Sequence, residues 1–132
     1  MNTPELIAQW LLKADHDLGT AKLIYLHLPD YYDTIAFHCQ QAVEKYLKTY
    51  LIYLNIDFKP VHDLRYLLNL VLTQDLTLDT MYESISSLND YAVKIRYPDL
   101  TIHLTKQELE NAIELAQQVK ELIENKMAIT NN

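Results

Sequence analysis

The chain has 132 residues, of which 49% are hydrophobic, so it is long enough for one hydrophobic core and too short for two ordinary domains. One glycine and four prolines are too few for the turns of an all-β protein, and the composition therefore predicts helices. The formal charge of −7 excludes a protein that coats nucleic acid through a broad basic surface. The single cysteine, Cys39, excludes an intramolecular disulfide and a cysteine-based metal site.

Two long helices are predicted in the first half of the chain. Thr3 is the expected cap of the first helix, Pro4 lies in its first turn, and Pro29 ends it. Asp30 is the expected cap of the second helix, and the short link predicts that the two helices are antiparallel. In both helices apolar residues recur at alternating spacings of four and three, as in a helix bundle: Ile7, Leu11, Ala14, Leu18, Ala21, Tyr25 and Leu28, then Tyr32, Ala36, Cys39, Val43, Tyr46, Tyr50 and Tyr53.

A short third helix is predicted after the break NIDFKPVHD. Pro60 disfavours a helical conformation at Lys59, and either Asp63 or His62 can cap the helix that follows. Its apolar residues are Leu64, Leu67, Leu68 and Val71.

Capping boxes predict the starts of two more helices. Thr80 with Glu83 is the first box, and Thr105 with Glu108 is the second. Pro98 separates the two helices, whose apolar residues are Met81, Ile85, Leu88, Ala92 and Ile95, then Leu109, Ala112, Ala116, Val119 and Ile123.

The predicted fold is therefore all-α, an antiparallel up-and-down bundle of four to five helices. We expect a single domain over residues 1–132, with an ordered core at about residues 3–127. No apolar run approaches the roughly 20 residues of a membrane span, and the N-terminus has no basic region followed by an apolar stretch. We therefore expect no membrane segment and a cytoplasmic location.

The sequence lacks the motifs of several kinds of catalytic site. The five histidines form neither Glu-x-x-His nor His-x-x-x-His, which a metal site on helices requires. The chain has no Gly-x-Ser-x-Gly elbow, and Gly19 alone cannot form a phosphate-binding loop. We expect neither a metal nor a cofactor.

The second predicted helix carries two stripes of side chains, one of tyrosines and one of polar residues. Its tyrosines, Tyr46, Tyr50 and Tyr53, would either stack nucleic-acid bases or pack in the core or a dimer interface, and packing is the usual role. A polar stripe beside them has residues at spacings of three, four and three. Such a stripe is usually exposed to water, and it is also where a phosphate would bind; it consists of His38, Gln41, Lys45 and Lys48.

The segment KIRYPDLTIH, residues 94–103, has two interpretations. As structure, Arg96 complements the negative end of a helix dipole and Pro98 ends the helix. As chemistry, His103 exchanges protons near neutral pH, and the guanidinium of Arg96 stabilises negative charge on the pentacoordinate phosphorus centre of RNA cleavage. Since one histidine cannot easily be both acid and base, the catalytic interpretation includes a symmetric homodimer with two copies of each residue in one cleft.

Four segments resemble the HEPN family: WLLKADHDLGTAKLI, YYDTIAFHCQQAVEKYLKTYLI, KPVHDLRYLL and YAVKIRYPD. The resemblance runs from about Trp10 to Asp99, and FHCQQAVEKYLK and RYPD are its most specific parts. It implies a bundle of four or five helices that commonly dimerises. Many members resemble prokaryotic toxins paired with a small nucleotidyltransferase antitoxin, and many are metal-independent endoribonucleases with the motif Arg, four to six residues, His.

That motif falls on Arg96 and His103, which have six residues between them. The resemblance thus implies that these two residues are catalytic, and RNA or nucleotide contacts are expected from Gln41, Lys45, Lys48 and Tyr97. The first hypothesis is a dimeric toxin–antitoxin or defence protein that cleaves RNA without a metal and does not act on DNA. The alternatives are a non-catalytic module that binds a nucleotide or a nucleotidyltransferase partner, and a bundle that serves only for dimerisation.

Overall fold

The computed structural model describes residues 3–95 and 104–131, and all the regular secondary structure in these residues is helical. The prediction of an all-α bundle with four to five helices is confirmed. The described chain forms five α-helices and one 3-10 helix, η1: α1 (Thr3–His27), α2 (Tyr32–Tyr53), α3 (Leu64–Leu72), η1 (Leu76–Met81), α4 (Tyr82–Ile95) and α5 (Lys106–Asn131).

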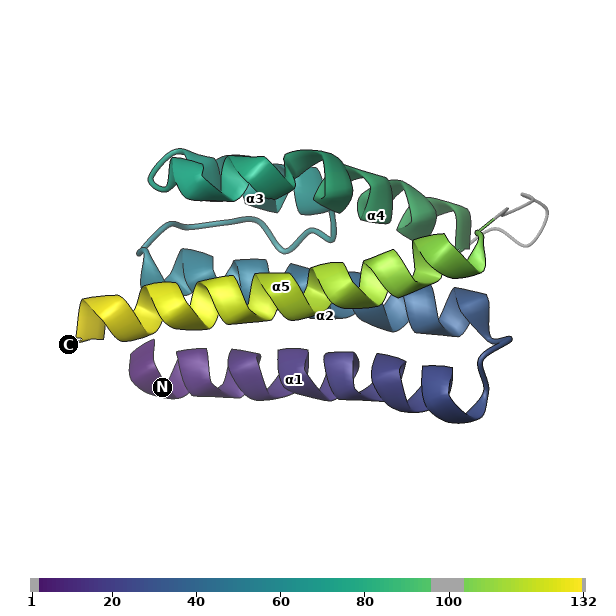
Figure 1. The fold of residues 1–132 in the computed structure, drawn as a ribbon. Helices are drawn as coiled ribbons and strands as arrows, with labels where there is room; N and C mark the ends of the chain where they lie inside the picture. Colours follow the sequence, from purple (N-terminus) through teal and green to yellow (C-terminus); the bar gives the residue numbers. More distant parts are fainter. Residues whose placement is uncertain (1–2, 96–103, 132) are drawn as a thin grey trace.

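Helix α2 is the centre of the bundle. Figure 1 shows α1, α2 and α5 lying side by side along the molecule, with α3 and α4 in a second row. Because α2 contacts each of the other four α-helices, most of its surface is covered. Its fully buried apolar side chains form the middle of the core: Ile35, Ala36, Cys39, Ala42, Val43, Leu47 and Leu51. None of the helices in the described residues is both long enough and apolar enough to cross a membrane.

The tyrosine stripe of α2 belongs to the core, so the packing interpretation of these residues is confirmed. Tyr46 is fully buried and Tyr50 is 4% exposed. The ring of Tyr53 stacks on that of Tyr50, with 6.1 Å between the ring centroids.

Tyrosine hydroxyls also join elements that are distant in the sequence. Four of them donate a hydrogen bond to a carboxylate, and the pairs are Tyr25 with Glu110 (2.5 Å), Tyr46 with Asp15 (2.6 Å), Tyr50 with Asp75 (2.5 Å) and Tyr91 with Glu108.

The carboxyl group of Asp75 illustrates the effect of such a bond. Burial raises the pKa of Asp75, but hydrogen bonds from Thr77 and Tyr50 and the nearby charge of Lys126 outweigh it and lower this pKa to about 2. The carboxylate therefore remains an anion and a hydrogen-bond acceptor at neutral pH.

Two of the predicted helix caps are present. Asp63 precedes α3 and accepts hydrogen bonds from the backbone N–H groups of Arg65 and Tyr66, so it is Asp63 and not His62 that caps this helix. Thr105 and Glu108 form the reciprocal bonds of a capping box, at 3.0 and 3.2 Å, and thereby begin α5.

Two other predicted caps are wrong. Tyr31, not Asp30, is the residue before α2, and no side chain caps that helix. Thr80 and Glu83 form no capping box, because the chain has already entered η1, which Asp75 caps through the N–H of Thr77. The hydroxyl of Thr80 instead donates to the carbonyl oxygen of Thr77.

Two threonine substitutions test which of the two predicted capping boxes contributes to stability. Thr105→Ala is expected to lower the free energy of unfolding by about 1 kcal/mol, because it removes the acceptor for the N–H of Glu108. Thr80→Ala is expected to change it by less than about 0.5 kcal/mol, since the Thr80 side chain is exposed and caps no helix. Urea unfolding followed by circular dichroism measures both, and equal losses in the two variants would contradict the assignment of the caps.

Candidate functional site

The polar stripe of α2 contacts two carboxylates, one from α1 and one from α2 itself. The first is Asp17, on α1. Its carboxylate lies 3.0 Å from Nδ1 of His38 and accepts a hydrogen bond from the ammonium group of Lys45. This contact forms because α1 packs along α2, and His38 and Lys45, seven residues apart, lie on the same side of α2.

The second carboxylate, Glu44, is buried and has three polar partners. Its side chain is 3% exposed and accepts hydrogen bonds from Lys48 (3.2 Å) and Gln40 (3.4 Å). The third partner is His62, in the connection between α2 and α3, whose Nδ1 lies 3.0 Å from Oε1 and 3.2 Å from Oε2. We call these four residues, Gln40, Glu44, Lys48 and His62, the Glu44 cluster.

Lys48 departs most from the expectation that the polar stripe is exposed to water. The residue is 5% exposed, and its ammonium group lies 5.6 Å from the ring centroid of Trp10 and 6.0 Å from that of Phe58. The pair with Glu44 that the i, i+4 spacing predicts is present, but it is buried. Burial in low dielectric strengthens the attraction within the pair and makes each partner dependent on the other.

The remaining stripe residue, Gln41, also has an internal partner. It is half-buried and donates a hydrogen bond of 2.8 Å to the side-chain oxygen of Gln40. The structure thus places Gln41, Lys45 and Lys48 along one side of α2, as predicted, but pairs each lysine with a carboxylate. A phosphate would have to compete with Asp17 or Glu44 for these cations, and the RNA- or nucleotide-binding role of the three residues stays a prediction.

The remaining predicted site residues, Arg96, Tyr97 and His103, lie outside the described residues. Their roles stay predictions as well. The described chain ends at Ile95, the last residue of α4, and resumes at Leu104, two residues before α5.

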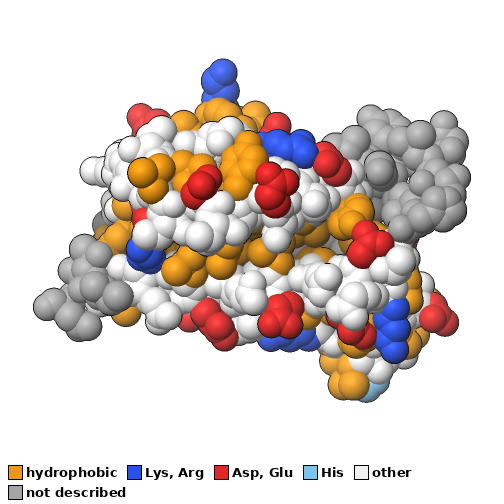
Figure 2. Space-filling model, turned by 45° about the horizontal axis from the view of Figure 1, so that its top comes forward, with side chains coloured by type: hydrophobic (Ala, Val, Ile, Leu, Met, Phe, Trp, Pro, Cys, Tyr) orange, Lys and Arg blue, Asp and Glu red, His pale blue; other side chains and the backbone are white. Residues whose placement is uncertain are grey.

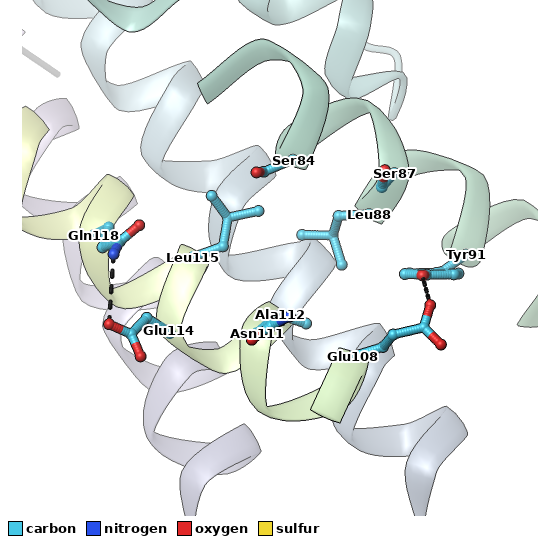
Figure 3. Close-up of a pocket in the computed structure, with 10 residues that line it drawn as sticks. All are labelled: Ser84, Ser87, Leu88, Tyr91, Glu108, Asn111, Ala112, Glu114, Leu115 and Gln118. Carbon is cyan, nitrogen blue, oxygen red and sulfur yellow. Dashed lines mark hydrogen bonds between the residues drawn. The ribbon is translucent and has the colours of Figure 1, made fainter. Parts of the chain in front are cut away.

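A cavity of about 450 Å³ lies between α4 and α5 (Figure 3). Figure 2 shows hydrophobic side chains along the groove that crosses this face of the molecule. Leu88, Ala112 and Leu115 supply the apolar part of the cavity wall. The polar part comes from both helices: Ser84, Ser87, Tyr91, Glu108, Asn111, Glu114 and Gln118.

At one end of this cavity, the hydroxyl of Tyr91 donates a hydrogen bond to Glu108 (Figure 3). This bond, burial and the charge of Glu108 raise the pKa of Tyr91 to about 12, so the phenol is a donor and not a base at neutral pH. The same bond, together with those from Thr105, lowers the pKa of Glu108. Both pKa values are therefore shifted away from neutrality, so neither group is tuned for acid–base exchange near pH 7.

Other reactive groups in the described residues are inactive or dispersed. Burial raises the pKa of the Cys39 thiol to about 12, which excludes a reactive thiolate. In the described part of the chain, no group of three or more His, Cys, Asp or Glu side chains is arranged to hold a metal ion.

The structure therefore adds one residue that the sequence interpretation missed as a site candidate, His62. The interpretation treated His62 only as a cap for α3. The available signal was its position just before Asp63, an expected cap of the third helix, so the His62 side chain was not needed to begin that helix.

Comparisons with known proteins agree with this architecture. The model of the HEPN domain family matches residues 7–126. The crystal structure of an archaeal HEPN homologue superposes with a TM-score of 0.72 at 20% identity, and the alignment covers 92% of this chain and 97% of that one. The crystal structure of the Thermus thermophilus protein TT1696 gives a TM-score of 0.73 at 27% identity, with 91% and 97% covered. A search of curated proteins found no match. Because the family model spans most of the sequence, the chain belongs to the HEPN domain family.

Proposed function

We propose that this HEPN domain protein cleaves RNA without a metal ion, through Arg96 and His103, as the toxin or effector of a prokaryotic toxin–antitoxin or defence system. The observation that carries the proposal is the spacing of these two residues, with six between them, in a chain that belongs to this family. The proposed cellular location is the cytoplasm, and the proposed antitoxin partner is a small nucleotidyltransferase.

The proposed reaction is attack by a ribose 2′ oxygen on the neighbouring phosphorus. The 2′-hydroxyl loses its proton, the bond from phosphorus to the 5′ oxygen breaks, and the leaving oxygen takes up a proton. The products are a 2′,3′-cyclic phosphate and a 5′-hydroxyl end. His103 exchanges a proton in this step, and Arg96 stabilises the negative charge on the phosphate oxygens.

The pairing of charges on α2 supports a role for Arg96. Lys45 and Lys48 are held by Asp17 and Glu44, so neither is free to neutralise the reacting phosphate. A guanidinium is always charged in proteins and has the planar geometry that suits a phosphate. A homodimer is part of the proposal, because two copies of His103 in one cleft supply both an acid and a base.

Cleavage of a mixed RNA pool in EDTA by the purified full chain tests this function. His103→Ala and Arg96→Ala are each expected to lower the cleavage rate by about 10²-fold or more. Arg96→Lys is expected to recover only part of the rate, since lysine keeps the charge but loses the planar fork. His27→Ala is the matched control, because His27 is an exposed histidine at the end of α1, and it is expected to cleave as the wild type does.

Each variant is compared after circular dichroism and sedimentation have shown that its fold and oligomeric state match those of the wild type. Cleavage by the wild type that leaves cyclic phosphate ends and is lost in both alanine variants supports the proposal. If the wild type does not cleave, or all variants cleave equally, the proposal is wrong, and a non-catalytic module that binds a nucleotide or a partner becomes the better account.

A further inference from the structure

The cavity between α4 and α5 has an apolar floor and an acidic rim. Leu88, Ala112 and Leu115 form the floor, and these residues are between 2% and 6% exposed. Glu108 and Glu114 form the rim on the α5 side, as Figure 3 shows. We call these five residues the α4–α5 groove, and Figure 2 shows acidic side chains beside it. Its floor and rim fit a ligand that has an apolar side and cationic edges.

The rim carboxylates keep their negative charge uncompensated, because their hydrogen-bond donors in the described residues are neutral. Glu108 accepts hydrogen bonds from Tyr91 and from the backbone N–H of Thr105. Glu114 accepts one from Gln118 at 3.4 Å. Two further glutamates of α5 have neutral donors in the same way, Glu110 from Tyr25 and Glu121 from Gln117.

Carboxylates on α1 and α2 are treated differently. Asp15, Asp17 and Glu44 are each paired with a lysine. The fold therefore neutralises these carboxylates internally, whereas the glutamates of α5 are oriented by neutral donors and their charge is left for a ligand from outside.

The acidic surface extends along α5 beyond the groove. A second cavity, of about 590 Å³, lies on the α1 side of α5, shares Glu114 with the first and adds Glu110 and Glu121. Its lining also includes Lys22, which donates to Gln117. From position 108 to position 121 the carboxylates cover about 20 Å of helix, at roughly 1.5 Å per residue. A facing helix of about 14 residues has this length.

Two possible occupants of the groove are disfavoured by its charge. The phosphates of RNA would be repelled by Glu108 and Glu114, so this face is unsuited to the proposed substrate. A second copy that docked by two-fold symmetry would bring the same acidic rim against itself, and like charges across an interface are unfavourable. A chain with a net charge of −7 instead attracts a partner of the opposite sign.

We propose that the α4–α5 groove binds a basic amphipathic helix of a partner protein. Apolar side chains of that helix pack on Leu88 and Leu115, and its lysine or arginine side chains pair with the glutamates of the rim. This is recognition of a helix in a groove, in which the apolar contacts supply affinity and the flanking charges supply specificity. The inference goes beyond the proposed RNA cleavage and does not depend on it.

Binding of a synthetic peptide to the full chain tests this inference by fluorescence anisotropy. The probe is a labelled helical peptide of about 14 residues with leucine on one face and lysine along both edges of that face. The wild-type protein is expected to bind it. A peptide with glutamate in place of each lysine is expected not to bind, and one with serine in place of each leucine is expected to bind at least about tenfold more weakly.

Variants of the protein locate the binding. Glu114→Lys is expected to weaken binding of the lysine–leucine peptide about tenfold or more. The matched control is Asp57→Lys, which makes the same charge change at an exposed residue outside the cavity and is expected to keep the affinity within about twofold. Ser87→Trp is expected to fill the groove and to weaken binding about tenfold, whereas Ser87→Ala leaves the groove open and is expected to bind as the wild type does.

Each variant is compared after circular dichroism has shown that its fold matches that of the wild type. The proposal is wrong if the wild type does not bind the lysine–leucine peptide, or if Ser87→Trp binds it as tightly. Equal losses in Glu114→Lys and Asp57→Lys, or equal affinity for the lysine–serine peptide, would reduce the binding to bulk charge attraction and overturn the groove as a helix site. A wild-type homodimer that Ser87→Trp dissociates in sedimentation would assign the groove to a second copy instead. None of these results bears on RNA cleavage, which is measured separately.

Discussion

Lys48→Met is expected to lower the free energy of unfolding by about 3 kcal/mol, because the carboxylate of Glu44 then stays buried without its cation. Breaking a buried ion pair by removing one partner costs about 3–5 kcal/mol. The lower end applies here, since Gln40 and His62 still donate hydrogen bonds to Glu44. Methionine keeps most of the lysine volume, so little of the loss comes from an empty cavity.

Two further variants test that explanation by urea unfolding at pH 7. The double variant Glu44→Gln with Lys48→Met is expected to recover most of the lost stability, because the buried charge is gone. Lys22→Met is the matched control: Lys22 is exposed and donates to Gln117, so its replacement is expected to change stability by less than about 0.5 kcal/mol. Equal losses in Lys48→Met and Lys22→Met would show that the Glu44 cluster does not depend on its lysine.

Tyr46→Ala is expected to lower the free energy of unfolding by about 3–5 kcal/mol, because the ring is fully buried in the middle of α2. Tyr46→Phe is expected to lower it by only about 1 kcal/mol. This substitution removes the hydrogen bond to Asp15 but keeps the ring, and Asp15 still accepts a hydrogen bond from Lys120. The difference between the two variants measures the contribution of ring packing.

The same unfolding experiment checks that Tyr46→Ala is less stable than Tyr46→Phe. If Tyr46→Phe were as unstable as Tyr46→Ala, the hydroxyl and not the ring would hold α2 to its neighbours. Tyr31→Ala is the surface control, since Tyr31 is 51% exposed, and it is expected to lose much less stability than Tyr46→Ala.

The helices were predictable where the decisive signal is local. Prolines bound α1, and the box of Thr105 and Glu108 begins α5, because these effects operate within one turn of the chain. The box of Thr80 and Glu83 has the same pattern and fails. A pattern of four residues cannot show that Asp75 has already started η1 upstream.

The candidate site was less predictable because its contacts join distant parts of the chain. Helical spacing places Lys48 on a polar stripe, but its burial depends on Trp10 and Phe58, which no periodicity in α2 can reveal. His62 meets Glu44 only because the connection after α2 folds back along that helix. For Arg96 and His103 the sequence provides the spacing and the chemistry, and these remain predictions.

The hydroxyl-to-carboxylate bonds between elements connect two features of the composition, the ten tyrosines and the net charge of −7. An acidic bundle that tied its helices together with lysines alone would have contacts that weaken as salt is added. A phenol is a neutral donor, so it satisfies a carboxylate without cancelling its charge. The tyrosines therefore let the protein keep a negative surface, which favours solubility, while its helices stay joined by bonds that depend little on ionic strength.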